Sequence, residues 1–165
     1  MSAPAASPAT ADLSDAAPQA QIAEPVFRDF GGRAAFSGQV VTLRVFEDHS
    51  LLRAALETPG GGRVLVVDGG ASLNCALLGG NMADLAVRNG WAGVVINGCV
   101  RDTAELRGKE LGVKALSAHP RRSAEQGEGE QQVSVMFAGV RIEPDDWVYA
   151  DADGLLVSRE ALHLP

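Results

Sequence analysis

Arginine, aspartate and glycine gather at two places where a buried strand gives way to a helix. Arg101 and Asp102 follow the apolar segment 92–97, and Gly79 and Gly80 open a helical pattern. An arginine can hold a carboxylate through two parallel hydrogen bonds. An aspartate can ligate a hard divalent cation, with water at most of its other positions. These residue types predict a pocket for an anion and a metal ion, which suits a substrate with a carboxylate next to a carbonyl.

The glycines would contribute backbone rather than side chains. Residues 79–82 (Gly-Gly-Asn-Met) open the predicted helix, and exposed N–H groups at a helix start attract anions. A simpler interpretation remains open, because a Gly-Gly pair before a helix is usually turn chemistry and an Arg-Asp pair is usually a solvated turn. Glu105, three residues after Asp102, lies on the same side of its helix and alone is typical of a surface charge.

Motifs that would point to other chemistry do not occur in the sequence. It has no GxxxxGK[ST] phosphate loop, no GxSxG nucleophile elbow and no HExxH metal helix. The glycines at 60–62 do not complete a GxGxxG motif, because Leu65 stands at the position of the last glycine. His49, His119 and His163 fall in unrelated segments. A nucleotide-binding function therefore has little support.

The elements that must position these residues alternate between strand and helix, which predicts parallel βαβ units with right-handed crossovers. In chain order, the apolar runs and helical spacings predict strand 63–68, helix 82–89, strand 92–97, helix 103–107 and strand 113–118. Ligands of such open sheets bind beyond the carboxyl ends of the strands. The turn expected at 98–102 follows such an end.

The flanking segments complete an α/β domain. They predict a helix at 10–17, a strand at 36–46, a helix at 51–56, a charged loop at 120–132, and short strands at 133–142, 147–150 and 155–157. The last three are expected to form an additional antiparallel or mixed sheet. With 165 residues, the chain suits a single domain over 11–165 behind a flexible tail at 1–10.

Charge and composition disfavour several classes of protein. Because nucleic-acid binders usually carry a basic patch, the net charge of −7 argues against direct binding to DNA or RNA. Cys75 and Cys99 form no CxxC pair, so we expect no disulfide framework and a cytoplasmic location. The sequence shows neither an apolar run that would span a membrane nor a secretory signal.

Four segments of the sequence resemble a known family. They are GRVLVVDGG at 62–70, LLGGN at 77–81, NGWAGVVINGCVRD at 89–102 and YADADG at 149–154. The most specific feature is Gly80, followed after twenty residues by Arg101 and Asp102 and, after two more, by Glu105. From about residue 12 to 164, the chain is similar to the RraA-like family, which contains 4-hydroxy-4-methyl-2-oxoglutarate aldolases and the regulator of ribonuclease E activity A.

The resemblance implies a fold, an assembly and a reaction. The fold is a three-layer β/β/α swivelling-type domain, which would form a homotrimer or a dimer of trimers with sites at subunit interfaces. The aldolases of the family are class II lyases that cleave 4-hydroxy-4-methyl-2-oxoglutarate to two pyruvates and also decarboxylate oxaloacetate. They need a divalent ion such as Mg²⁺ or Mn²⁺. Both reactions pass through a pyruvate enolate, whose charge a metal ion and a nearby cation stabilise.

Transferred to this sequence, the resemblance assigns roles to individual residues. Those that would bind the substrate are Gly79, Gly80, Asn81, Met82 and Arg101. Arg101 would also offset the enolate charge, and Asp102 would ligate the metal ion. Glu105 would position a metal-associated or ordered water that acts as the base.

A second function is also open, because the regulator in the same family is non-catalytic and inhibits ribonuclease E. An acidic surface would suit a basic protein partner. The intact pair of Arg101 and Asp102 favours the enzyme, since the resemblance to dedicated regulators does not extend to it. Two features depart from the aldolases: Gly80 stands where many carry an acidic residue, and the short end at 159–165 would not supply an acidic group across an interface.

Overall fold

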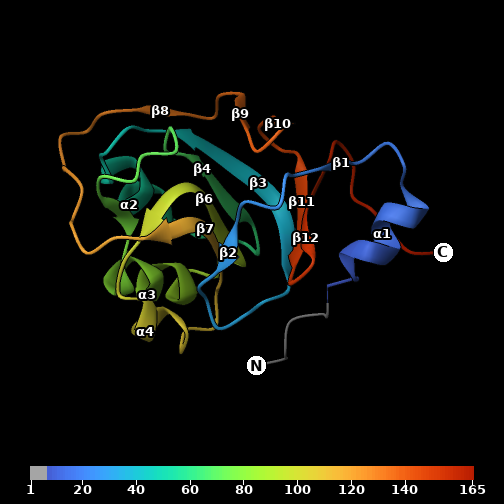
Figure 1. The fold of residues 1–165 in the computed structure, drawn as a ribbon, viewed down its shortest axis with the longest axis horizontal. Helices are drawn as coiled ribbons and strands as arrows, with labels where there is room; N and C mark the ends of the chain where they lie inside the picture. Colours follow the sequence, from blue (N-terminus) through green and yellow to red (C-terminus); the bar gives the residue numbers. More distant parts are fainter. Residues whose placement is uncertain (1–6) are drawn as a thin grey trace.

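The computed structural model describes residues 7–165, which form a ten-stranded sheet, a small second sheet and four helices (Figure 1). The centre of the large sheet is parallel. Its strands are, in spatial order, β3 (Phe36–Arg44), β4 (Val64–Asp68), β6 (Gly93–Val100) and β7 (Gly112–Ala118). All of β6 and most of β4 are buried, as expected for Val- and Ile-rich strands covered on both faces. The predicted parallel core is confirmed.

Three helices follow the parallel strands and gather on one side of the sheet. α2 (Ser50–Leu56) follows β3, and α4 (Thr103–Leu106) follows β6. Between β4 and α3 (Gly80–Arg88) the chain forms one more strand, β5 (Ala76–Leu78), which pairs with β6. Figure 1 shows the three helices together below and beside the parallel strands. Their apolar side chains and those of the sheet form one hydrophobic core.

β3 joins the parallel strands to an antiparallel group. It pairs with β11 (Trp147–Asp151), which pairs with β12 (Gly154–Ser158), and β12 pairs with β1 (Gln21–Ile22). β9 (Val135–Phe137) and β10 (Val140–Ile142) form the second sheet and pack on a second hydrophobic core with β3, β4 and β11. The predicted β/β/α arrangement, with an antiparallel part beside the parallel core, is confirmed.

Short elements close the edges of the sheet. β2 (Arg28–Asp29) pairs with β7, and β8 (Glu130–Gln131) pairs with β3 inside the loop predicted at 120–132. α1 (Thr10–Ala16) confirms the helix predicted at 10–17 and packs on β11 and β12. It begins at the last residue of the tail predicted at 1–10, of which residues 1–6 lie outside the described part of the chain.

Two predicted strands differ from the structure in ways that matter. The strand predicted at 92–97 continues to Val100, so the turn predicted at 98–102 is wrong over its first three residues. β6 tolerates this extension because its register against β7 shifts around Gly98 and because β5 pairs with its end. The strand predicted at 133–142 is instead a hairpin, β9 and β10, whose turn residues Ala138 and Gly139 both have positive φ.

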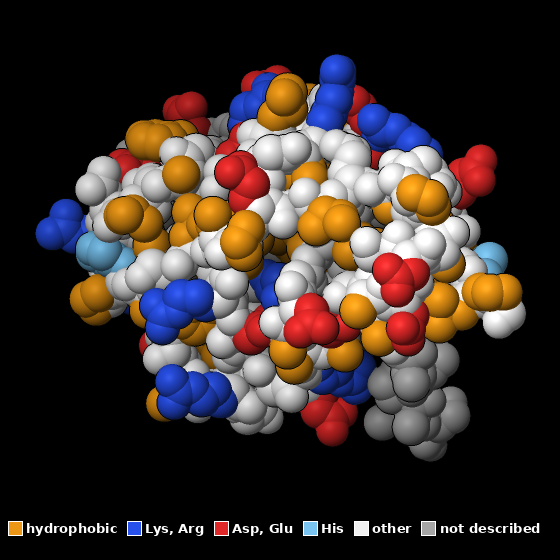
Figure 2. All heavy atoms as spheres, turned by 45° about the vertical axis from the view of Figure 1, so that its right-hand side comes forward, with side chains coloured by type: hydrophobic (Ala, Val, Ile, Leu, Met, Phe, Trp, Pro, Cys, Tyr) orange, Lys and Arg blue, Asp and Glu red, His pale blue; other side chains and the backbone are white. Residues whose placement is uncertain are grey.

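The surface drawn in Figure 2 mixes charges of both signs. Basic and acidic side chains alternate across this face with hydrophobic side chains between them, so the face presents no continuous basic area to a nucleic acid. Among residues 7–165, no helix is both long and apolar enough to cross a membrane.

Candidate active site

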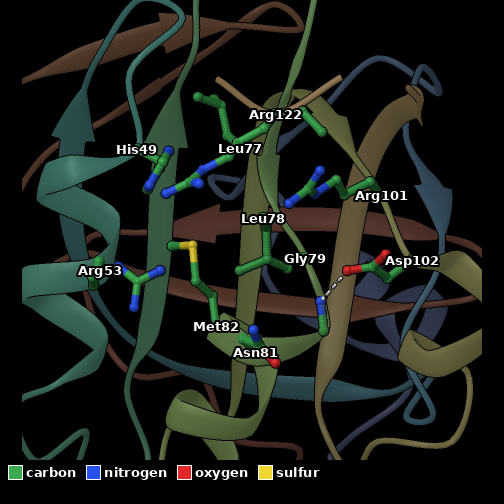
Figure 3. Close-up of a pocket in the computed structure, with 12 residues that line it drawn as sticks. His49, Arg53, Leu77, Leu78, Gly79, Asn81, Met82, Arg101, Asp102 and Arg122 are labelled. Carbon is green, nitrogen blue, oxygen red and sulfur yellow. Dashed lines mark hydrogen bonds between the residues drawn. The ribbon is translucent and has the colours of Figure 1, made fainter. Parts of the chain in front are cut away.

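A pocket of about 170 Å³ lies between α2, the start of α3 and the end of β6 (Figure 3). Six of the predicted residues line one side of it, and we call them the sheet wall: Gly79, Gly80, Asn81, Met82, Arg101 and Asp102. Three further residues line the other side, and we call them the arginine wall: His49, Arg53 and Arg122. Figure 3 shows His49 and Arg53 at α2, facing Arg101 and Asp102 across the start of α3.

The start of α3 contributes four residues to the sheet wall, Gly79, Gly80, Asn81 and Met82. Gly79 is the N-cap and has an extended backbone, with φ −132° and ψ −170°. The Gly80 N–H donates to Asp102 Oδ2 at 2.8 Å, so the anion that this first N–H attracts belongs to the protein itself. The N–H groups of Asn81 and Met82 also have no acceptor within the helix, because the first turn of a helix leaves its donors unpaired. These two groups are therefore the ones that a bound anion can meet.

Asp102 reaches α3 because of an unusual backbone. It is the N-cap of α4 with a left-handed conformation, φ 57° and ψ 42°, and its side chain does not cap its own helix. An aspartate in this conformation is uncommon, and such residues gather at ligand sites. The preceding residue is held at the strand end by a hydrogen bond from the Arg101 N–H to the Leu78 carbonyl, at 2.9 Å. Arg101 and Asp102 are thus fixed by β5 and α3.

Glu105 lies behind this wall rather than in the pocket lining. A Cβ added to Gly80 would meet the Glu105 carboxylate, and one added to Gly79 would come within 2.8 Å of Asp102 Oδ2. The two glycines therefore make room for two carboxylates. The structure places Glu105 next to Gly80.

The arginine wall depends on a loop that lies far from α2 in sequence. Arg122 is placed by a bridge between its backbone and Ala76 of β5. The Asp48 carboxylate ties the loop to the start of α2, because it accepts hydrogen bonds from Ser50 N at 2.9 Å and Gln126 N at 2.6 Å. Burial alone would raise the pKa of Asp48, but these and further hydrogen bonds outweigh it and lower the pKa.

One carboxylate, that of Glu125, faces all three residues of the arginine wall. Glu125 Oε2 lies 3.2 Å from Arg122 Nη2, while Oε1 lies 3.6 Å from Arg53 Nε and 3.8 Å from His49 Nε2. Glu125 is half-exposed, so these ion pairs are screened by solvent. Arg53 Nε itself is buried and finds no hydrogen-bond acceptor among residues 7–165.

His49 contributes a neutral side chain to this wall. Its Nδ1 lies 2.9 Å from Ser123 Oγ, and the ring is buried. Burial lowers the pKa of His49, the guanidinium groups of Arg122 and Arg53 lower it further, and Glu125 opposes them. At neutral pH the positive charge of the pocket therefore comes from arginine.

The pocket can bind a small polyanion and, through Asp102, a hard cation. Three guanidinium groups and the two N–H groups of α3 are donors for carboxylate oxygens. Among residues 7–165, no group of three or more His, Cys, Asp or Glu side chains is arranged as a metal site. Mg²⁺ typically binds one or two protein carboxylates and takes its other ligands from substrate and water, and Asp102 fits that pattern.

Sequence reasoning missed the arginine wall. α2 follows β3, so Arg53 lies beyond the carboxyl end of a parallel strand, and the rule that located Arg101 would have located it too. Arg122 lies in the loop that follows the carboxyl end of β7, so the same rule applies to it, while the position of this loop also depends on distant contacts. His49 shares no sequence pattern with the other two histidines, and only the fold sets it apart.

Comparison with known proteins connects this site to a family. A sequence profile of the RraA-like family, described as Aldolase/RraA, matches residues 10–157. A Deinococcus radiodurans protein with the provisional name 4-hydroxy-4-methyl-2-oxoglutarate aldolase is 66% identical over 148 residues, which cover 90% of this chain and 92% of that protein.

Solved structures agree with the sequence comparison. The RNA-processing inhibitor RraA from Thermus thermophilis matches with a TM-score of 0.90 and 51% identity, over 97% of this chain and 94% of that one. A Geobacillus kaustophilus structure named S-adenosylmethionine:2-dimethylmenaquinone methyltransferase matches with a TM-score of 0.92 and 46% identity, over 93% and 96% of the two chains. The shared profile, the high identity and the common fold show that this chain belongs to the RraA-like family.

Proposed function

We propose that this chain is a divalent-metal-dependent aldolase that cleaves 4-hydroxy-4-methyl-2-oxoglutarate to two pyruvates and also decarboxylates oxaloacetate. The observation that carries the proposal is the convergence of Arg101, Asp102 and the start of α3 on one pocket. The aldolase name of the 66% identical Deinococcus protein supports the same reaction.

The sheet wall would hold the pyruvoyl end of the substrate. Arg101 carries several N–H donors for the carboxylate, and the N–H groups of Asn81 and Met82 lie at the same wall. Asp102 would hold the metal ion, with its Oδ2 already oriented by the Gly80 N–H. When bound, Mg²⁺ or Mn²⁺ supplies Lewis-acid stabilisation to the oxygen on which negative charge develops.

The proposed cleavage is a retro-aldol reaction. The hydroxyl group on C4 loses its proton, the C3–C4 bond breaks, and its electron pair moves to the C2 keto oxygen as an enolate. One pyruvate leaves, and a proton returned to C3 converts the enolate into the second. Arg101 would offset the enolate charge, and Glu105, beside Gly80, would position the water that moves the proton.

Inhibition of ribonuclease E is the second candidate, favoured by the 51% identity to the Thermus inhibitor and by the net charge of −7. It would use the outer surface and leave the pocket free. A methyltransferase function suits the pocket less well, because S-adenosylmethionine carries a sulfonium cation that three lining arginines would repel. For this chain we further propose a cytoplasmic location and a homotrimer or a dimer of trimers.

The test is pyruvate release by the purified protein from 4-hydroxy-4-methyl-2-oxoglutarate and from oxaloacetate, with Mg²⁺ and then with EDTA. We expect turnover of both substrates that EDTA abolishes and excess Mg²⁺ restores. Absent turnover, or turnover indifferent to EDTA, would overturn the metal-dependent aldolase. If the protein shows no turnover and a ribonuclease E scaffold fragment binds it at moderate salt, the regulator becomes the better proposal.

A further inference from the structure

The arginine wall has hydrogen-bond donors that the protein does not use. Arg53 Nε is buried without an acceptor among the described residues, and the nearest carboxylate oxygen, Glu125 Oε1, is 3.6 Å away. Buried donors in folded proteins nearly always have a partner, so an orphan in a pocket lining indicates an acceptor that comes from outside the chain. A ligand carboxylate would supply it.

The same wall also keeps a positive charge. Arg53 and Arg122 share one carboxylate, Glu125, which is 48% exposed and cannot neutralise both. His49 adds no charge, because burial lowers its pKa. Two guanidinium groups with one half-exposed counter-ion therefore leave an excess charge of one at the pocket.

The excess positive charge lies across the pocket from the sheet wall, so it faces the end of a ligand that the sheet wall does not hold. Figure 3 shows Arg53 and His49 across the pocket from Arg101 and Asp102. A ligand whose pyruvoyl carboxylate is held by Arg101 would direct its far end toward α2. In a pocket of about 170 Å³, that far end is only a few atoms away.

We propose that Arg53 and Arg122 bind the second carboxylate of the substrate, the one attached to C4, and thereby select 4-hydroxy-2-oxo acids with two carboxylates. This inference rests on the proposed aldolase function, which by itself assigns no role to either arginine. A substrate that lacks this carboxylate leaves the buried Arg53 Nε without its acceptor, and sites built around such donors reject the shortened analogue strongly.

The decisive experiment compares two substrates that differ only at C4. 4-Hydroxy-4-methyl-2-oxoglutarate has a carboxylate there, and 4-hydroxy-2-oxopentanoate has a hydrogen atom in its place. For the wild type we expect kcat/KM to be on the order of 10²-fold higher for the dicarboxylate, the size typical of losing one charge-assisted contact. Arg53→Gln and Arg122→Gln should each lower this ratio about tenfold, and the double variant should bring it close to one.

Matched variants separate charge recognition from damage to the fold. Arg53→Lys and Arg122→Lys keep the charge and should restore part of the ratio. Arg88→Gln changes an exposed arginine on α3 away from the pocket and should keep the wild-type ratio. Exchange of the methyl protons of pyruvate in D₂O reports on the sheet wall alone, and it should persist in the Arg53 and Arg122 variants.

Each outcome decides one of the two proposals. If the wild type cleaves neither substrate, the aldolase function fails, and this inference fails with it. If the wild type cleaves both equally well, or if the arginine variants lose both substrates in parallel with pyruvate exchange, the aldolase survives and the second carboxylate site is wrong.

Discussion

The two walls of the pocket differ in charge, since the sheet wall pairs Arg101 with Asp102 while the arginine wall keeps an excess positive charge, and they are built in opposite ways. The sheet wall consists of residues at the ends of β5 and β6 and at the start of α3. Two hydrogen bonds hold it: the Gly80 N–H donates to the Asp102 carboxylate, and the Arg101 N–H donates to the Leu78 carbonyl. The arginine wall joins α2 to a loop about seventy residues later in the chain, through Asp48 and Glu125.

This difference shows which parts of a site local structure can hold and which need distant contacts. A βα connection places its residues by strand pairing and helix geometry, so the sheet wall should keep its shape when the loop is disturbed. The arginine wall has only a few polar contacts across a long separation, so it should fail first. Substitutions in both walls test this contrast.

The largest effect is expected at Asp102. Asp102→Asn keeps an acceptor for the Gly80 N–H but removes the charge that would hold the metal ion, so kcat for both proposed reactions should fall by on the order of 10³-fold. Mg²⁺ affinity, followed by calorimetry, should fall in parallel while the melting temperature hardly changes. Asp84→Asn, which alters a carboxylate paired with Lys109 outside the pocket, is the control. Unchanged Mg²⁺ affinity in Asp102→Asn would contradict the assignment.

Asp48 should be the weak point of the arginine wall. Asp48→Asn replaces a charged acceptor of two backbone hydrogen bonds, so the free energy of unfolding should fall by about 1–3 kcal/mol. KM for the dicarboxylate should rise, because the loop that carries Arg122 loosens. Since the pKa of Asp48 is lowered in the folded state, its charge stabilises the protein above pH 3.8, and this contribution is lost as the pH falls through the folded value.

Asp151→Asn is the matched control for this prediction. Asp151 is another carboxylate with a lowered pKa, and it accepts hydrogen bonds from Thr10 N and Oγ1 far from the pocket. It should lose stability in denaturant titrations without a change in KM. A KM that rises equally in both variants would mean that the arginine wall is no more dependent on its loop than the rest of the protein.

The two glycines of the sheet wall offer a smaller, paired test. Gly79→Ala would place a Cβ 2.8 Å from Asp102 Oδ2 and 3.3 Å from Arg101 Cγ, so it should lower kcat/KM about tenfold, since a small misplacement of binding groups is costly. Gly80→Ala displaces only the mobile end of Glu105 and should change kcat/KM less. Equal losses of kcat/KM in the two variants would indicate that the position of Glu105 is as important for activity as that of Asp102.

The smallest effect concerns the titration of His49. Burial lowers its pKa below the ordinary 6.5, so the unfolded chain binds this proton more readily than the folded protein. Stability should therefore fall as the pH drops from about 6.5 toward the folded pKa, and it should be unaffected above 6.5. His49→Gln should flatten this part of the stability–pH curve measured by urea unfolding. An unchanged slope would show that His49 does not contribute to it.

Much of the fold could be predicted because its signals are local. The apolar runs behind β4, β6 and β7 and the glycines that open α3 predicted the parallel core and the sheet wall. The end of β6 was placed wrongly, because Gly98 is typical of a turn and only pairing with β5 keeps the chain extended there. β5 itself is too short to leave a pattern.

The parallel core, the family and the residues of the sheet wall could be predicted from the sequence. Strand and helix periodicity and the spacing of Gly80, Arg101, Asp102 and Glu105 are properties of continuous segments of the chain. Two facts about the site required the fold: the Gly80 N–H is occupied by Asp102, and Arg53 and Arg122 line the same pocket. Those facts depend on where a backbone turns left-handed and on which distant loop a buried carboxylate holds, and neither leaves a periodic trace in the chain.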